Sequence, residues 1–246
     1  MFLSASKCQI KNGGFSVQCD FSFEIGNHLS LFGPSGSGKS SVLLGLAGFL
    51  PIINGNLIYD DKSISKIEPK DRPFDLLFQE NNLFPHLTVS GNILLGLGAK
   101  AKMDLQNSHI VNEILDLVGL YKERNRLPQD ISGGQRSRAA IARSLIRKKP
   151  ILLLDEPFAA LDFELKNEIL ALLLRVTRKN NLSIILVSHD PRDVQYLGGD
   201  VVLFSENGQT DFYKNKRFWS FFVIFSVFSL KSVSYTHLRA HETDSY

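Results

Sequence analysis

The sequence predicts an α/β fold with a largely parallel sheet, because short apolar segments of strand length alternate with segments of helical periodicity. Two segments show this most clearly. The run ILLL at 151–154 is apolar at every position, which is typical of a strand buried on both faces. The segment 163–179 repeats leucine, isoleucine and valine at helical spacing, which indicates a helix that packs on a core. A chain of 246 residues is long enough for one such domain, with room for a subdomain.

The remaining elements follow from apolar runs, periodicity and the breaks at glycine and proline. We expect further strands at 28–32, 56–59, 75–78, 183–187 and 201–204. We expect helices at about 39–47, over most of 89–118 with a break near 96–100, after 131, and near 191–197. The resulting order of strands and helices is that of a parallel sheet whose connections are helical.

Composition excludes several classes of protein. The formal net charge of +3 is too small to indicate a nucleic-acid partner. Cys8 and Cys19 form no C-x-x-C pair and have no histidine cluster nearby, so we interpret them as buried thiols in a reducing compartment. The first ten residues contain no apolar run long enough for a signal peptide, and we expect a cytosolic location.

The character of the sequence changes sharply at residue 214. The run FWSFFVIFSVFSL at 218–230 is rich in phenylalanine but shorter than the about 20 residues that span a membrane. The residues after it show no periodicity. We interpret 214–246 as a divergent tail that is disordered or not native coding sequence, such as a frameshift or read-through into an adapter. The alternative is an amphipathic tail that touches a membrane.

The segment GPSGSGKS matches the phosphate-binding pattern G-x-x-x-x-G-K-[ST] and lies between a predicted strand and a predicted helix. Glycines let successive backbone N–H groups turn inward around an anion, and the helix directs its positive end at the same point. Lys39 adds a full charge for the β- and γ-phosphates, and the Ser40 hydroxyl is suited to Mg²⁺. The predicted phosphate-binding residues are Gly33, Pro34, Ser35, Gly36, Ser37, Gly38, Lys39, Ser40 and Ser41.

Two acids follow the buried strand at 151–154. Asp155 lies at its carboxyl end, the edge of a parallel sheet where ligands bind, and a carboxylate there suits a bound Mg²⁺. Glu156 is placed one residue further out, where it could polarise a water molecule for in-line attack on the γ-phosphorus. The alternative for Glu156 is a solvated charge at the end of a strand.

The segment ISGGQ at 131–135 raises a question, because two adjacent glycines at the start of a helix cost stability, roughly 1 kcal/mol each relative to alanine. Ser132 is a good N-cap, and Gly133 and Gly134 leave the helix start bare for a second anion. This helix need not reach its own phosphate loop and could reach that of a second copy. ATP would then lie between two chains, with Ser132 and Gly134 at the γ-phosphate. A helix start without a ligand is the alternative.

Taken together, these motifs resemble the ATP-binding subunits of ABC transporters. GPSGSGKS, LLFQENNLFPHLTV, ISGGQ, ILLLDEP, AALD and VSHD occur in that family's order and cover about residues 1–212. The resemblance implies a P-loop NTPase core of the ABC ATPase type with a mostly parallel sheet, in a domain at 1–213. It also implies a helical signature subdomain at about 80–148. ATP and Mg²⁺ would be the ligands of this domain.

The resemblance also implies roles for single residues. Gln79 corresponds to the glutamine that senses Mg²⁺ and the attacking water, and His189 to the histidine that contacts the γ-phosphate. Asp162 corresponds to a residue that communicates across the dimer, and Gln135 completes the signature. The chain departs from the pattern at Ile131, where leucine is commoner.

The family stacks an aromatic residue on adenine, and the corresponding region here reads IKNGGFSVQC. Phe15 is the nearest aromatic candidate, and Asn12 could instead occupy the usual position.

Within the family, the chain is most similar to importer subunits and in particular to the ATPases of thiamine importers, through QENNLFPHLTV. This similarity implies an ATPase that powers import of thiamine or a related pyrimidine. Its partners would be a second copy of itself, integral membrane permease subunits and, indirectly, a periplasmic substrate-binding protein. It would lie peripherally on the cytoplasmic face of the inner membrane.

Leu83, Phe84 and Leu87 would form a docking groove for a helix of the permease, or would simply pack the helical arm. Three alternatives for the whole chain remain open. They are the ATPase of a transporter with another cargo, a soluble ABC protein that acts on ribosomes or DNA, and an inactive fragment.

Overall fold

The computed structural model describes residues 1–77, 83–158, 161–205 and 208–214. Its strands form two sheets, one with the order β10-β9-β3-β8-β7-β6 and one with the order β2-β1-β4-β5. The strands of the six-stranded sheet are β3 (His28–Phe32), β6 (Phe74–Leu77), β7 (Ile151–Asp155), β8 (Ser183–Ser188), β9 (Asp200–Phe204) and β10 (Thr210–Tyr213). Its neighbours are parallel except for the β9–β10 pair. The α/β prediction is therefore confirmed.

The second sheet is entirely antiparallel. It consists of β1 (Phe2–Asn12), β2 (Phe15–Glu24), β4 (Ile52–Tyr59) and β5 (Lys62–Ser63). The strand predicted at 56–59 is thus the second half of β4 and belongs to the antiparallel sheet. β1 and β2 pair through the tight turn at Gly13 and Gly14, so they need no helical crossover.

The helices begin and end close to the predicted positions. They are α1 (Lys39–Ala47), α2 (Val89–Leu94), α3 (Leu105–Val118), α4 (Gly133–Leu145), α5 (Phe163–Asn180) and α6 (Pro191–Leu197). Short 3₁₀ turns lie at 69–71, 95–97, 121–123 and 128–130. No helix in the described ranges is long and apolar enough to cross a membrane.

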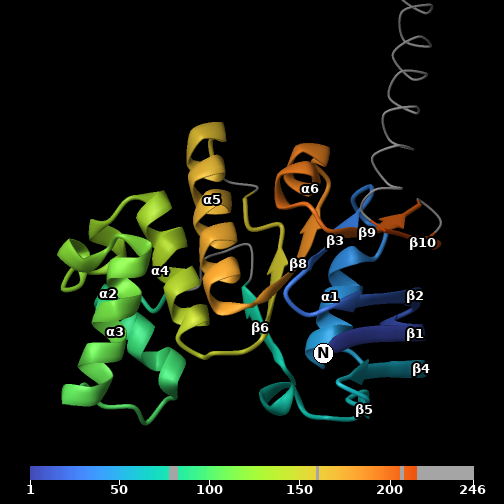
Figure 1. Ribbon diagram of the computed structural model, residues 1–246, viewed down its shortest axis with the longest axis horizontal. Helices are drawn as coiled ribbons and strands as arrows, with labels where there is room; N and C mark the ends of the chain where they lie inside the picture. Colours follow the sequence, from blue (N-terminus) through green and yellow to red (C-terminus); the bar gives the residue numbers. More distant parts are fainter. Residues whose placement is uncertain (78–82, 159–160, 206–207, 215–246) are drawn as a thin grey trace, which may run out of the picture.

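The parallel sheet has a separate core on each face, because alternate residues of its central strands point to opposite sides. Ile151 and Leu153 of β7 face a core that contains α1 and the antiparallel sheet. Leu152 and Leu154 face a core that contains α2, α3, α4 and α5. Figure 1 shows this arrangement, with α2, α3 and α4 gathered on one side of α5, and α1 beside β1 and β2 on the other.

Candidate functional site

Three neighbouring parallel strands end at the same edge of the sheet. The order β3-β8-β7 places the phosphate loop at 33–38, the pair at 188–189 and the pair at 155–156 next to one another. This edge is where open α/β sheets bind ligands. The topology therefore gathers most of the residues that the sequence singles out. Gln79 follows β6 on the same sheet and lies outside the described residues.

The phosphate loop leads into α1 through Gly38, whose φ of 98° is left-handed and favours glycine. A Cβ atom at Gly38 would also lie only 3.0 Å from Phe15 Cε1. Helix α1 begins with no side-chain cap, so the free N–H groups of its first turn have no side-chain acceptor of their own. Lys39 Nζ donates to the carbonyl oxygens of Gly33 at 2.9 Å and Pro34 at 2.6 Å. The loop is thus shaped to receive an anion.

Ser40 and Asp155 face each other across this loop. The Ser40 hydroxyl donates to Asp155 Oδ1 at 2.8 Å. The pKa of Asp155 is raised, because the effect of burial outweighs that of the Ser40 hydrogen bond, which lowers it. The pKa of the Lys39 ammonium is lowered, because burial outweighs the attraction of Glu156 and Asp155, which raises it. A hydroxyl and a carboxylate oxygen in a partly dehydrated site suit a hard divalent cation such as Mg²⁺.

Glu156 and His189 come together at the mouth of the same edge. The distance between His189 Nδ1 and Glu156 Oε1 is 3.3 Å. Glu156 has a φ of 43°, unusual for a residue with a side chain, and its N–H donates to Val187 O at 3.2 Å. Such a backbone conformation costs of the order of 1–3 kcal/mol and is concentrated at functional sites. The chain thus turns sharply after β7 and presents a carboxylate beside an imidazole, a pair able to take up a proton from water.

Phe15 lies beside the phosphate loop and its side chain is 42% exposed. Together with Asn12, Ser41 and the loop it lines a cavity of about 330 Å³. The Asn12 side-chain amide donates to Ser41 Oγ at 3.0 Å, so it is bonded to α1. Of the two residues considered from the sequence, the structure presents Phe15 as the aromatic ring at this cavity.

Helix α4 begins with a complete capping box. Ser132 Oγ accepts from the Gln135 N–H at 3.2 Å, and Gln135 Oε1 accepts from the Ser132 N–H at 3.0 Å. Gly133 faces open space, with Arg136 Nη2 at 3.8 Å from where its Cβ would be. A Cβ at Gly134 would lie 2.3 Å from Leu165 Cδ1 of α5. The second glycine therefore packs closely against Leu165 of its own chain, a contact that the sequence did not reveal.

The start of α4 and the phosphate loop belong to different parts of the chain. The helix α4 packs in the core on one face of the parallel sheet, and α1 packs in the core on the other face. Asp162 is the N-cap of α5, where its Oδ1 accepts from the Leu165 N–H at 2.8 Å, and it is exposed. The exposed residues Ser132 and Asp162 are accessible to a second chain.

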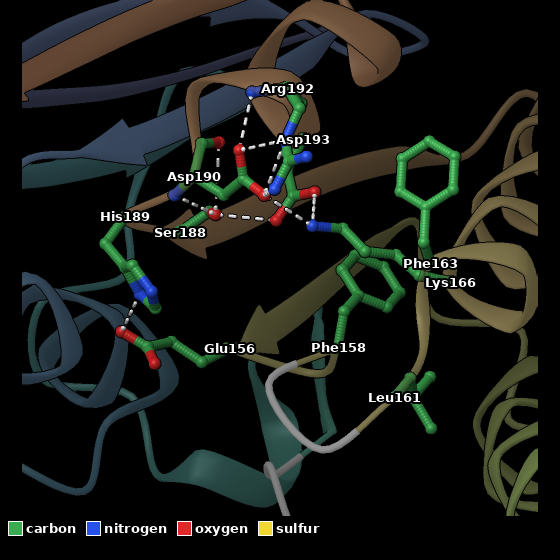
Figure 2. Close-up of a pocket in the computed structure, with 10 residues that line it drawn as sticks. All are labelled: Glu156, Phe158, Leu161, Phe163, Lys166, Ser188, His189, Asp190, Arg192 and Asp193. Carbon is green, nitrogen blue, oxygen red and sulfur yellow. Dashed lines mark hydrogen bonds and ion pairs between the residues drawn. The ribbon is translucent and has the colours of Figure 1, made fainter.

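Sequence reasoning missed a charged cluster beside Glu156 and His189. These residues line a cavity of about 290 Å³. Figure 2 shows Lys166 of α5 pointing toward Asp190 and Asp193 in it. The apolar periodicity of 163–179 concealed Lys166, because a lysine inside such a stripe is usually a solvated charge. One part of this charged cluster has a sequence signal. Asp190 stands directly before Pro191, which is the pattern of an N-cap followed by proline at the first position of a helix.

Comparison with known proteins agrees with this geometry. The sequence pattern described as ABC transporter matches residues 17–159. The chain is 41% identical over 197 residues to the thiamine import ATP-binding protein ThiQ of Ruegeria sp. (strain TM1040), covering 80% of this chain and 85% of that protein. It is 43% identical over 191 residues to ThiQ of Haemophilus influenzae (strain KW20), covering 77% and 88%. The chain belongs to the ABC transporter family.

A solved structure shares the fold. An inward-facing metal-chelate type ABC transporter superimposes with a TM-score of 0.74 at 24% identity, covering 87% of this chain and 83% of that chain. At this identity the match bears on the fold alone. It supports the overall fold that the structure describes.

Proposed function

We propose that the protein is the ATP-hydrolysing subunit of an ABC importer and that its cargo is thiamine. The observation that carries the first part is the uncapped start of α1 beside Lys39 and the Ser40–Asp155 pair. The cargo rests on the similarity to thiamine import ATP-binding proteins at about 40% identity over most of both chains.

In this proposal the loop amides and Lys39 hold the β- and γ-phosphates of ATP. Ser40, Asp155 and Gln79 would hold Mg²⁺, which neutralises phosphate charge when bound. Glu156 accepts a proton from the attacking water, and His189 donates a hydrogen bond to the γ-phosphate. Phe15 stacks on the adenine. The short distance between Glu156 and His189 supports a joint action of these two side chains.

We further propose that the active unit contains two copies of the chain, with Ser132, Gly133, Gly134 and Gln135 of one copy facing the γ-phosphate in the other. The position of α4 on the opposite face of the sheet from α1 supports this arrangement. Asp162 would lie at the same contact between the two copies. No nucleic acid takes part in the proposed reaction.

ATP-driven association tests the two-chain site. Glu156→Gln removes the base and keeps the shape of the side chain, so this variant is expected to bind ATP and Mg²⁺ and to dimerise, as measured by light scattering after size exclusion. Adding Gly133→Asp brings a negative charge to a position that faces open space, and the dimer is expected to be lost while each chain still binds ATP. A Glu156→Gln protein that stays monomeric with bound ATP would refute the proposal.

The permease would dock beside Phe84. Its ring is 46% exposed, and the loop that presents it is held by Asn92, whose side chain bonds the backbone of Phe84 at 2.7 and 3.1 Å. Phe84 lines a cavity of about 410 Å³ together with Leu95 and Arg143. Leu83 instead packs on the core, so the sequence expectation of a shared apolar groove applies best to Phe84. This arrangement would place the subunit peripherally on the cytoplasmic face of the membrane.

Transport tests the cargo. Co-expression with the permease and the periplasmic binding protein encoded beside it should give ATP-dependent uptake of thiamine. Strong uptake of another solute without thiamine would overturn the cargo and leave the ATPase proposal intact. ATPase activity without any transport partner would instead favour a soluble ABC protein.

We propose a domain at 1–213 followed by a dispensable tail. Phe212 and Tyr213 of β10 pack on the core, and Lys214 Nζ lies 3.3 Å from Ser22 O and Asp200 Oδ2. A chain that ends after Lys214 should therefore keep its melting temperature and its ATPase activity. A chain that ends after Phe212 should melt earlier, because it loses part of the strand that pairs with β9. If the chain that ends after Lys214 unfolds, the tail belongs to the fold.

A further inference from the structure

Lys166 lies in the first turns of α5 and its side chain is 14% exposed. Its Nζ is 2.8 Å from Asp190 Oδ2 and also forms an ion pair with Asp193 Oδ1. Figure 2 shows its stem running between the rings of Phe158 and Phe163 toward these two carboxylates, on the far side of the cavity from Glu156. An ammonium that is confined in this way fixes the distance between α5 and the start of α6.

Both residues next to His189, Ser188 and Asp190, belong to this hydrogen-bond network. The Asp190 N–H donates to Ser188 Oγ at 3.0 Å, and the Ser188 hydroxyl donates to Asp193 Oδ2 at 2.8 Å. The His189 side chain is 56% exposed, and among the residues that the structure describes its imidazole pairs with Glu156 alone. Its position therefore depends on the backbone on either side, which the network of Lys166 fixes.

The charges of this cluster balance only when Lys166 is present. Arg192 bonds Asp190 at 2.9 Å from a side chain that is 71% exposed. Asp193 is 6% exposed, and without Lys166 the Ser188 hydroxyl is the side-chain donor that it keeps among the described residues. A buried carboxylate without its cation is strongly destabilised. The loop that carries His189 would have to open to expose this carboxylate to water.

We propose that Lys166 is a positioning residue for ATP hydrolysis, which holds His189 in reach of Glu156 through the ion pairs with Asp190 and Asp193. This inference rests on the proposed ATPase function. Lys166 acts through His189 and touches neither ATP nor the attacking water.

Steady-state kinetics on the full chain tests the role. Lys166→Met is expected to lower kcat on the order of 10- to 100-fold, the effect of a misplaced group at a reacting centre, with little change in the KM for ATP. Lys166→Arg should recover most of kcat, because it restores the cation. Lys179→Met is the matched control, since Lys179 is an exposed lysine near the other end of α5. Because Lys166 acts through His189, adding Lys166→Met to His189→Ala should lower kcat little further.

Three results would overturn the proposal. The first is a kcat for Lys166→Met equal to that of Lys179→Met. The second is a loss of kcat that Lys166→Arg does not recover. The third is a double variant whose loss of kcat is the product of the losses in Lys166→Met and His189→Ala. The imidazole NMR signal of His189, assigned with His189→Gln, provides a readout that needs no hydrolysis. It should shift in Lys166→Met but not in Lys179→Met. An unchanged signal refutes the positioning role, whereas absence of ATPase activity in the wild type refutes only the proposed function.

Discussion

Helices α1 and α4 both have glycine at or next to their first residue, but only α4 has a side-chain cap. At α1 the helix starts after Gly38 and no side chain accepts from its free N–H groups. At α4 the Ser132 and Gln135 side chains satisfy each other's backbone N–H groups. The first helix start has no side-chain acceptor, whereas the capping box already satisfies two N–H groups at the second.

This difference indicates that the two helix starts use a ligand differently. In the proposed function, the α1 end binds phosphate within a single chain through its backbone donors and the Lys39 charge. The capping box already occupies part of the α4 end, so the proposed phosphate contact there depends on a second chain. We therefore expect substitutions at α1 to affect nucleotide binding and those at α4 to affect association or packing.

The largest effect is expected at Lys39. Lys39→Ala removes the charge that faces the phosphates, and hydrolysis should fall by roughly 10²- to 10³-fold, as when one preorganised electrostatic group is lost. The rise in melting temperature that ATP and Mg²⁺ produce should disappear as well, because it reports binding to the folded state. Lys62→Ala on the exposed strand β5 is the control. Retained thermal stabilisation by ATP in Lys39→Ala would show that α1 is not the main anion site.

Much of the parallel core could be predicted from the sequence, because buried central strands have uninterrupted apolar runs. ILLL, HLSLF and SIILV needed no knowledge of their neighbours. The antiparallel sheet was missed, although β2 alternates buried and exposed residues along its length and Asn12-Gly13 marks a hairpin turn. Two strands joined by such a turn pair locally, so apolar runs alone do not reveal them.

The candidate site, too, could be predicted from the sequence only in part. The residues next to strand ends were predictable, because the ends of parallel strands meet at one edge. Lys166 and the contact of Gly134 with Leu165 were not predictable, because both depend on how α5 packs against elements distant in the sequence. Ion pairs and close packing across a core have no local signature.

A second effect concerns the strand that leads into α1. His28 in β3 accepts from the Ile184 N–H at 3.2 Å through its Nδ1, and burial lowers its pKa from 6.5 to about 4. The unfolded chain then binds a proton that the folded chain does not, so stability is lost as pH falls from 6.5 toward 4. The loss is about 3 kcal/mol for a shift of this size.

His28→Gln removes this titration. Chemical denaturation of both proteins across this pH range should show a steeper decline in the wild type. The difference between the two curves isolates His28 from the carboxylates that titrate in the same range. Parallel curves for the two proteins would contradict the burial of a neutral imidazole at this position.

The third effect tests the packing of α4. Gly134→Ala is expected to lower the free energy of unfolding by roughly 1–2 kcal/mol, because overpacking costs more than alanine gains in helix propensity. Leu165→Ala should recover part of this loss in the double variant, since it removes the atoms that the new methyl group meets. Gly133→Ala, which meets open space, is the matched control. Equal effects at the two glycines would show that Leu165 does not restrict Gly134.

The smallest effect separates the two roles of Ser132. As an N-cap it should lose about 1 kcal/mol of stability in Ser132→Ala but only a few tenths in Ser132→Gly, because glycine is itself tolerated at a helix start. Both variants lack the hydroxyl, so a contact between Ser132 Oγ and a partner's γ-phosphate would lower ATPase activity by the same factor in both. Denaturation curves and steady-state ATPase rates on the same samples compare the two quantities. Equal activities with unequal stabilities support a contact to the second chain. If the ATPase activities of the two variants instead follow the order of their stabilities, Ser132 acts as a helix cap alone. In that case α1 is the helix start of the pair that binds ATP.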